Sequence, residues 1–161
     1  MKFSAPLLVV KDISTSRAFY EKLLDQTVVM DFGENITFDG GFSLQEQTSW
    51  LDFIDKTEDV LKTQANNMEL YFDAEAFPTF VEKLKSNPEI QLVHDVKEYS
   101  WGQRSIRFYD PDFHIIEVGE SIENVIRRFL KQGLTIEETA ARTQLPMEFI
   151  QQCAESVISG S

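Results

Sequence analysis

Two stretches of this chain repeat one pattern: residues 7–24 read LLVVKDISTSRAFYEKLL, and residues 68–85 read MELYFDAEAFPTFVEKLK. Each starts with an apolar run typical of a strand and continues with apolar residues at helical spacing. The shared residues keep one constant offset, so that Asp12, Phe19, Glu21, Lys22 and Leu23 return as Asp73, Phe80, Glu82, Lys83 and Leu84. We therefore predict two copies of one module.

Both copies are predicted to have the same order of elements. A helix follows the matched aspartate, with Ser14 or Thr15 expected to cap the first helix and Pro78 to fix the start of the second. Three short strand-like runs then follow in each copy, at residues 27–30, 36–38 and 42–45 and at residues 90–93, 105–108 and 114–118. The pattern predicts an α+β fold of paired βαβββ modules, about residues 3–46 and 67–119, joined by a crossover loop over residues 46–66.

Residues 121–161 change to helical spacing and are predicted to form a C-terminal helical extension beyond a domain of residues 1–120. One helix should stop at Gly133, a capping box from Thr135 to Glu138 should open the next, and Pro146 should start the last. Two short helices joined by Gln144-Leu145-Pro146 suggest a DNA-binding helix-turn-helix as one interpretation. Four bases and five acids in this segment offer no basic face to DNA, so we expect packing or dimerisation.

Composition excludes several classes of protein. The 161 residues carry a formal charge of −12, which repels nucleic acid and anionic membranes. The sequence has no apolar run long enough to span a membrane and no signal-peptide pattern at its start, so we expect a cytoplasmic protein. The single cysteine, Cys153, excludes an internal disulfide and a multi-thiolate metal site.

Two sets of motifs resemble the vicinal oxygen chelate superfamily, which includes glyoxalase I, bleomycin-resistance proteins, extradiol dioxygenases and fosfomycin-resistance enzymes. The sequence LVVKD at residues 8–12, with SRAFYEKLL at residues 16–24, is similar to the family's opening strand and helix. The sequence WGQR at residues 101–104, followed by Asp110-Pro111-Asp112 and Ile116-Glu117, is similar to the family's closing hairpin. The match covers about residues 3–120. It implies curved mixed sheets that form one cup, and a homodimer.

Four inward positions bind a divalent metal in the metal-dependent members of that superfamily. By resemblance, these positions in this chain are Ala5, Ser43, Asn67 and Glu117. Glu117 is the one usual metal ligand among them, so the resemblance implies no glyoxalase metal centre and no cofactor, while a weakly bound divalent metal stays open. The two histidines, His94 and His114, are not expected to replace the missing ligands.

Glu117 has two interpretations. If Pro111-Asp112 forms a two-residue turn, Ile106 lies opposite Glu117 and Arg104 lies diagonally across on the same face. The expected Arg104–Glu117 charge pair is either structural or in contact with a ligand. In an enzyme, Glu117 would be the catalytic carboxylate.

The bulky aromatic residues favour a binding role. Trp50, Tyr71, Trp101 and Phe42 either stack against a small aromatic or amphipathic molecule or pack in the core and at its rim. The full set of candidate ligand-binding residues is Ser43, Gln45, Trp50, Asn67, Tyr71, Trp101, Arg104 and Glu117.

Three functions remain open at this point. The first is a small-molecule-binding protein without the glyoxalase metal centre. The second is a lyase like lactoylglutathione lyase, or a dioxygenase, that uses Glu117 with atypical ligands. The third is a protein-interaction module that acts through the C-terminal helices.

Overall fold

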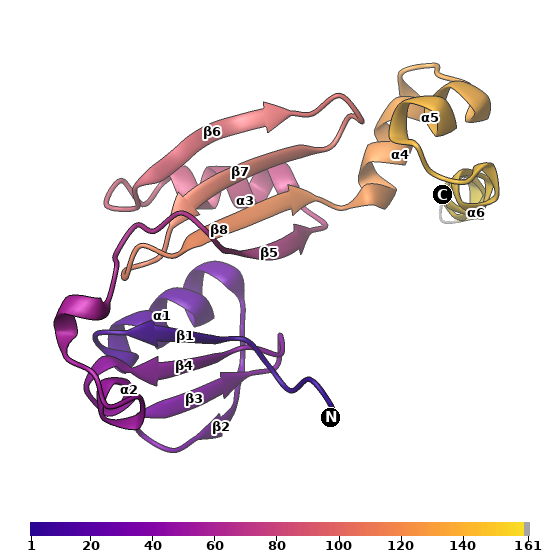
Figure 1. The fold of residues 1–161 in the computed structure, drawn as a ribbon. Helices are drawn as coiled ribbons and strands as arrows, with labels where there is room; N and C mark the ends of the chain where they lie inside the picture. Colours follow the sequence, from indigo (N-terminus) through magenta and orange to yellow (C-terminus); the bar gives the residue numbers. More distant parts are fainter. Residues whose placement is uncertain (160–161) are drawn as a thin grey trace. The chain divides into compact units, whose positions relative to one another are not determined.

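The computed structural model describes residues 1–159, so Gly160 and Ser161 of the predicted extension lie outside the described residues (Figure 1). The first module consists of β1 (Leu7–Val10), α1 (Ile13–Leu24), β2 (Val28–Asp31), β3 (Asn35–Phe38) and β4 (Ser43–Glu46). The second consists of β5 (Glu69–Ala74), α3 (Phe77–Lys85), β6 (Leu92–Glu98), β7 (Arg104–Tyr109) and β8 (Ile115–Glu120). The paired βαβββ prediction is confirmed.

The two sheets share one topology. Their strand orders are β1-β4-β3-β2 and β5-β8-β7-β6. In the first sheet, β1 runs parallel to β4, with Leu8 beside Leu44, whereas β4 and β3 are antiparallel, as are β3 and β2. Equivalent strands occupy equivalent places in the second sheet, as expected of a duplicated unit.

The chain forms two compact units that do not coincide with the two modules. The first comprises Met1–Leu70, Asn87–Gln91 and Phe108–Ile116, and the second comprises Tyr71–Ser86, Leu92–Arg107 and the chain from Glu117 onward. Strands β7 and β8 therefore contribute residues to both units.

Helix α1 covers the apolar face of the first sheet. Tyr20 of this helix is fully buried, with its ring centroid 5.6 Å from that of Phe38 and 5.1 Å from that of Phe42. Of the two interpretations of Phe42, the structure supports core packing over contact with a ligand, because this side chain is 3% exposed. The predicted cap is also wrong, since the Asp12 carboxylate accepts the Thr15 N–H at 2.6 Å. The aspartate that ends the strand also begins the helix.

The segment between the modules is more ordered than the predicted loop. It holds α2 (Gln47–Phe53) and a short 3₁₀ turn, η1 (Glu58–Val60). The Glu46 carboxylate accepts the Ser49 N–H at 3.0 Å and so caps α2. Trp50 consequently lies on a helix rather than in a loop.

The turn between β7 and β8 is one residue longer than predicted. The Asp110 N–H donates to the His114 carbonyl at 3.0 Å, which leaves three residues within the turn. Phe113 adopts the left-handed conformation there, with φ of 66°. This extra residue shifts the pairing of β7 with β8 by one position. Each residue of β7 therefore lies opposite a different residue of β8 from the one predicted.

Asp110 is the buried acceptor that organises this turn. Its carboxylate accepts the Tyr20 hydroxyl at 2.8 Å and the backbone N–H groups of Asp112 and His114 at 2.9 and 2.8 Å. The His114 ring lies 2.9 Å from the same carboxylate through Nδ1. Burial of the ring lowers the pKa of His114, but its hydrogen bond with Asp110 and the charges of Asp110 and Asp112 raise it more, so the net shift is upward.

The C-terminal extension folds as α4 (Ile122–Lys131), α5 (Ile136–Thr143) and α6 (Met147–Ser159). The predicted capping box is confirmed, because Thr135 and Glu138 exchange their side-chain and backbone hydrogen bonds. Ile126, Ala140, Ile150 and Cys153 form an apolar core shared by the three helices. None of the described helices has both the length and the apolar character needed to cross a membrane.

Gly102, in the hairpin between β6 and β7, is the point where α4 approaches the second sheet. Its φ is +91°, and a Cβ added there would lie 2.0 Å from Cζ of the fully buried Phe129. Both the backbone conformation and the space therefore require glycine.

We predict that Gly102→Ala lowers the free energy of unfolding by about 3 kcal/mol, combining left-handed strain with overpacking. Gly133→Ala is the matched control, because Gly133 has φ of +92° and nothing within 4 Å of an added Cβ. The control should cost about 1 kcal/mol in urea denaturation. Equal losses in the two variants would contradict the steric contribution of Phe129.

The His114–Asp110 interaction predicts a pH dependence. Because the pKa of His114 is raised in the folded state, its stabilisation is complete below the ordinary pKa and is lost as pH rises through the folded pKa. The stability lost in His114→Gln should be larger at about pH 5.5 than at about pH 9. Tyr20→Phe removes an uncharged donor from the same carboxylate, so its cost should change little between these pH values.

Candidate functional site

The candidate site lies on the face of the second sheet that α3 does not cover. Along β7 and β8, Ile106, Phe108, Ile116 and Val118 are buried on one face, and Arg107 and Glu117 alternate with them onto the other. Helix α3 packs along the apolar face of this sheet (Figure 1). The opposite face therefore carries polar side chains that do not pack into the hydrophobic core of the module.

Arg107 is the centre of this face. Its guanidinium forms an ion pair with the Glu117 carboxylate and donates to the Tyr99 hydroxyl. The same guanidinium lies 3.3 Å from Nε2 of His94, and its Cζ is 5.9 Å from the Tyr99 ring centroid. Glu117 is buried, with 6% of its surface exposed, whereas the Arg107 side chain is 23% exposed, so the pair is accessible through its guanidinium.

The predicted Arg104–Glu117 pair is wrong. Arg104 donates through Nε and Nη2 to both oxygens of Glu120, at 3.0 and 2.7 Å. The longer turn explains the exchange of partners. Because Asp110 pairs with His114, counting outward along both strands brings Arg107 opposite Glu117 and Arg104 opposite Glu120. Arg104 thus belongs to the α3 side of the sheet, where its Cζ lies 5.6 Å from the Phe77 ring centroid.

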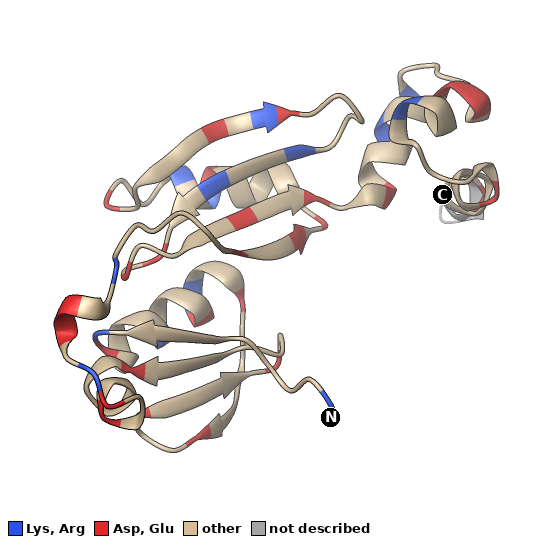
Figure 2. Cartoon of the chain, in the orientation of Figure 1, with Lys and Arg blue, Asp and Glu red and all other residues tan. Residues whose placement is uncertain are grey.

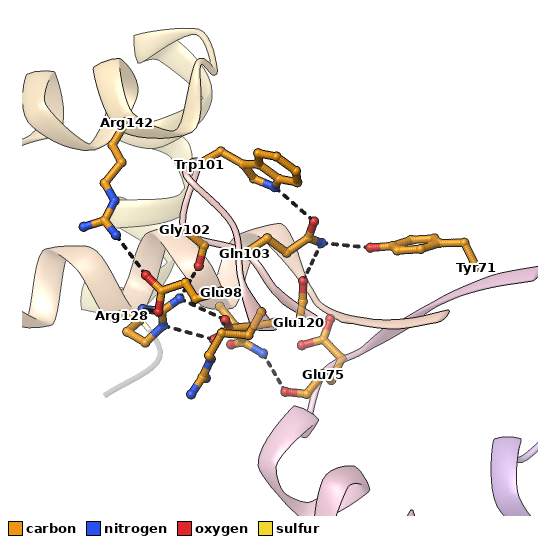
Figure 3. A network of polar contacts seen from close by, with 11 residues as sticks. Tyr71, Glu75, Glu98, Trp101, Gly102, Gln103, Glu120, Arg128 and Arg142 are labelled. Carbon is orange, nitrogen blue, oxygen red and sulfur yellow. Dashed lines mark hydrogen bonds and ion pairs between the residues drawn. The ribbon is translucent and has the colours of Figure 1, made fainter. Parts of the chain in front are cut away.

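Tyr71, Gln103 and Trp101 form a hydrogen-bonded row beside this cluster (Figure 3). The Gln103 amide donates to the Tyr71 hydroxyl at 2.8 Å and accepts from the Trp101 indole at 3.3 Å. The Trp101 ring stacks on Tyr99 with centroids 4.6 Å apart and planes 7° apart. Tyr99 therefore connects the Trp101 ring to the Arg107 guanidinium.

The position of the Tyr71 hydroxyl requires a glycine in the neighbouring strand β8. A Cβ added at Gly119 would lie 2.6 Å from the Tyr71 hydroxyl oxygen. That hydroxyl donates to Asp73 at 2.6 Å. Partial burial and the hydrogen bond to Asp73 raise the pKa of Tyr71, so this phenol stays protonated at neutral pH.

The remaining predicted residues belong to the first unit. The Ser43 hydroxyl is 2.9 Å from that of Thr37, and the Gln45 amide donates to Ser49 at 2.7 Å and accepts from Asn35 at 2.9 Å. Asn67 lines a pocket of about 200 Å³, together with Lys11, Gln47 and His114 among others. Trp50 is on α2.

Sequence reasoning missed Arg107, Tyr99, His94 and Gln103. A turn one residue longer would have revealed Arg107, because strand alternation then places it across from Glu117. No comparable signal marked Tyr99 or His94, whose distances from Arg107 depend on the course of β6 and its hairpin.

Three of the four residues at the family's metal positions do not fit a metal. Ala5 supplies no donor atom, Ser43 is engaged with Thr37, and the Glu117 carboxylate is paired with a guanidinium that repels cations. Within the described residues, no three His, Cys, Asp or Glu side chains gather where they could hold a metal ion.

Glu120 joins this row to the C-terminal helices (Figure 3). Its carboxylate is bound by Arg104 and also by Arg128 of α4, at 3.1 Å from Nη2. Its backbone carbonyl accepts the Gln103 amide at 2.9 Å. Burial opposes the charge of Glu120, but the hydrogen bonds and charges of the two arginines outweigh it and lower the pKa of this carboxyl.

The duplicated fold and these motifs define a chain of the glyoxalase-like class. The family described as "Glyoxalase-like domain" matches residues 3–123, more than half of the chain. The protein belongs to this family, within the vicinal oxygen chelate superfamily.

Solved structures share this fold. A protein of unknown function from Agrobacterium tumefaciens str. C58 is 36% identical, with a TM-score of 0.67, over 76% of this chain and 95% of that one. A glyoxalase-related enzyme from Fulvimarina pelagi is 19% identical, with a TM-score of 0.62, over 74% and 88% of the two chains. A genomically encoded fosfomycin resistance protein from Listeria monocytogenes is 20% identical, with a TM-score of 0.56, over 78% and 97%. No curated protein matches the chain.

We predict that Glu120→Gln lowers the free energy of unfolding by about 2–3 kcal/mol, because two arginines lose their shared buried partner. This is below the usual cost of breaking a buried pair, since the arginine side chains are 19–30% exposed. Glu98→Gln is the control, because Glu98 pairs with Arg128 and Arg142 at the surface and should cost less than about 1 kcal/mol. Urea denaturation would measure both, and equal costs would contradict the role of burial.

Proposed function

We propose that the protein binds a small aromatic molecule on the Arg107–Glu117 face without a resident metal. The observation that carries this proposal is the ion pair between Arg107 and Glu117. The Glu117 carboxylate is at the position that binds the metal in metal-dependent members, and here it is paired with the Arg107 guanidinium instead. A pair in this place can still recognise a ligand, because the carboxylate accepts from a hydroxyl group and the guanidinium donates to a carbonyl or phenol oxygen.

Exposed aromatic rings beside the pair support the choice of an aromatic ligand. Tyr71 is 47% exposed and Trp101 is 37% exposed, although both hydrogen-bond to the same Gln103 side chain. Rings fixed in this way offer a stacking surface that loses little conformational entropy on binding. Since the Arg107–Glu117 pair has no net charge, the ligand expected here is a neutral ring that carries hydroxyl or carbonyl groups.

The ligand can be tested with catechol and 4-hydroxyacetophenone as probes. In Trp50→Phe protein, where Trp101 is the one remaining tryptophan, these probes should quench the emission. Adding Tyr71→Leu should weaken Kd roughly tenfold, from lost stacking and burial. Phe53→Leu is the matched control, because it removes an exposed ring from α2, and it should leave Kd unchanged. Equal affinities in the two variants would contradict this binding face.

The absence of a resident metal can be tested separately. Protein purified without a chelator and without a metal-binding tag should contain much less than one equivalent of Zn, Ni, Fe or Mn by elemental analysis. It should not convert the hemithioacetal of methylglyoxal and glutathione when these ions are added. Stoichiometric metal and turnover that are both lost in Glu117→Gln would favour the lyase alternative instead.

A further inference from the structure

A basic groove lies on the other side of the second sheet, between the start of α3 and α4. It encloses about 400 Å³ and belongs entirely to the second compact unit. Figure 2 shows basic residues on β7 and α4, whereas basic and acidic residues are interspersed over the other elements. The charged side chains that line the groove are Arg104, Arg127, Arg128, Lys131, Glu75 and Glu120. Four cations and two carboxylates leave a local surplus of positive charge in a chain of net charge −12.

Two of the cations have fixed positions. Arg104 and Arg128 share the buried carboxylate of Glu120, and each guanidinium also lies over an aromatic ring, Phe77 at 5.6 Å and Phe129 at 5.0 Å. Their side chains are nonetheless 30% and 19% exposed. A ligand would therefore meet guanidinium groups that are already ordered, which reduces the entropy lost on binding.

The other two cations are not neutralised by an acid in the described part of the chain. Arg127 donates through Nη1 to the side-chain oxygen Oδ1 of Asn124 at 3.0 Å, and Nδ2 of Asn124 in turn donates to the Glu75 backbone carbonyl at 2.5 Å. Lys131 is exposed and has no ion pair among residues 1–159. An anion in the groove would give both side chains a partner of opposite charge.

We propose that this groove binds the phosphoryl group of a small phosphorylated molecule. Arginine forks match the geometry of phosphate oxygens, and a doubly charged phosphate monoester balances the local surplus of charge. Pro78 adds an exposed apolar side chain to the lining, and the volume of the groove exceeds that of a bare phosphate ion, so a small apolar or ring-shaped body fits beside the phosphate.

The groove depends on the C-terminal extension. Arg127, Arg128 and Lys131 follow residue 123, where the match to the glyoxalase-like family ends. This site is therefore separate from the face proposed above for aromatic ligands, and either proposal can fail without the other.

Phenyl phosphate is a suitable probe, because it combines a phosphate with a small apolar ring. Isothermal titration calorimetry should show one molecule bound per chain. In the double variant Arg127→Gln/Lys131→Gln, Kd should weaken roughly tenfold or more, from loss of charge-assisted hydrogen bonds. Since neither residue pairs with Glu120, the urea denaturation midpoint should stay close to that of the unmodified protein.

Arg17→Gln/Lys85→Gln is the matched control, because it removes the same two charge types from exposed ion pairs outside the groove. Its Kd for phenyl phosphate should remain within about twofold of the unmodified value. Equal weakening in both double variants would overturn the proposal, as would tighter binding of benzoate than of phenyl phosphate. Loss of phenyl phosphate binding in Arg107→Gln, with affinity kept in Arg127→Gln/Lys131→Gln, would also overturn it by moving the probe to the other face.

Discussion

The buried carboxylate of Glu120 is the constraint on which much of the second unit depends. A charge with so little exposure is stable there because two guanidinium groups surround it, one from β7 and one from α4. The pair of arginines in turn fixes how the C-terminal helices meet the sheet. Gly102 completes this junction, since its missing side chain leaves room for the Phe129 ring. The ion pairs of Glu120 and the packing of Phe129 against Gly102 thus both stabilise the contact between the glyoxalase-like domain and the C-terminal helices.

The two faces of the second sheet have different chemistry for a simple geometric reason. Strand alternation sends Arg107 to one face and Arg104 to the other, and each arginine meets the glutamate directly across from it on β8. On the Arg107 face, aromatic rings and amides surround a neutral pair. On the Arg104 face, α4 adds further cations around Glu120. One hairpin therefore supports two environments, one that we propose binds a neutral aromatic ring and one that we propose binds an anion.

The first unit shows how a single aspartate can organise a turn. Asp110 uses its two oxygens for two backbone amides, one tyrosine hydroxyl and one histidine ring. These contacts define a turn in which Phe113 takes a left-handed conformation that usually favours glycine. The register of β7 and β8, and with it the choice of arginine beside Glu117, follows from this turn.

The sequence by itself determined the duplicated βαβββ order, the helical extension and the family, because periodicity, offset and local motifs are properties of neighbouring residues. It also determined that Ala5 has no donor atom and that Ser43 and Asn67 are not usual ligands of zinc or nickel, because donor chemistry is set by residue type. Tertiary structure alone decided the partners of Glu117, since one extra residue in a turn reverses every face along a strand. The same holds for the groove beside Glu120. Arg104 and Arg127 are far apart in sequence, and only the folding of α4 against the sheet brings their charges together.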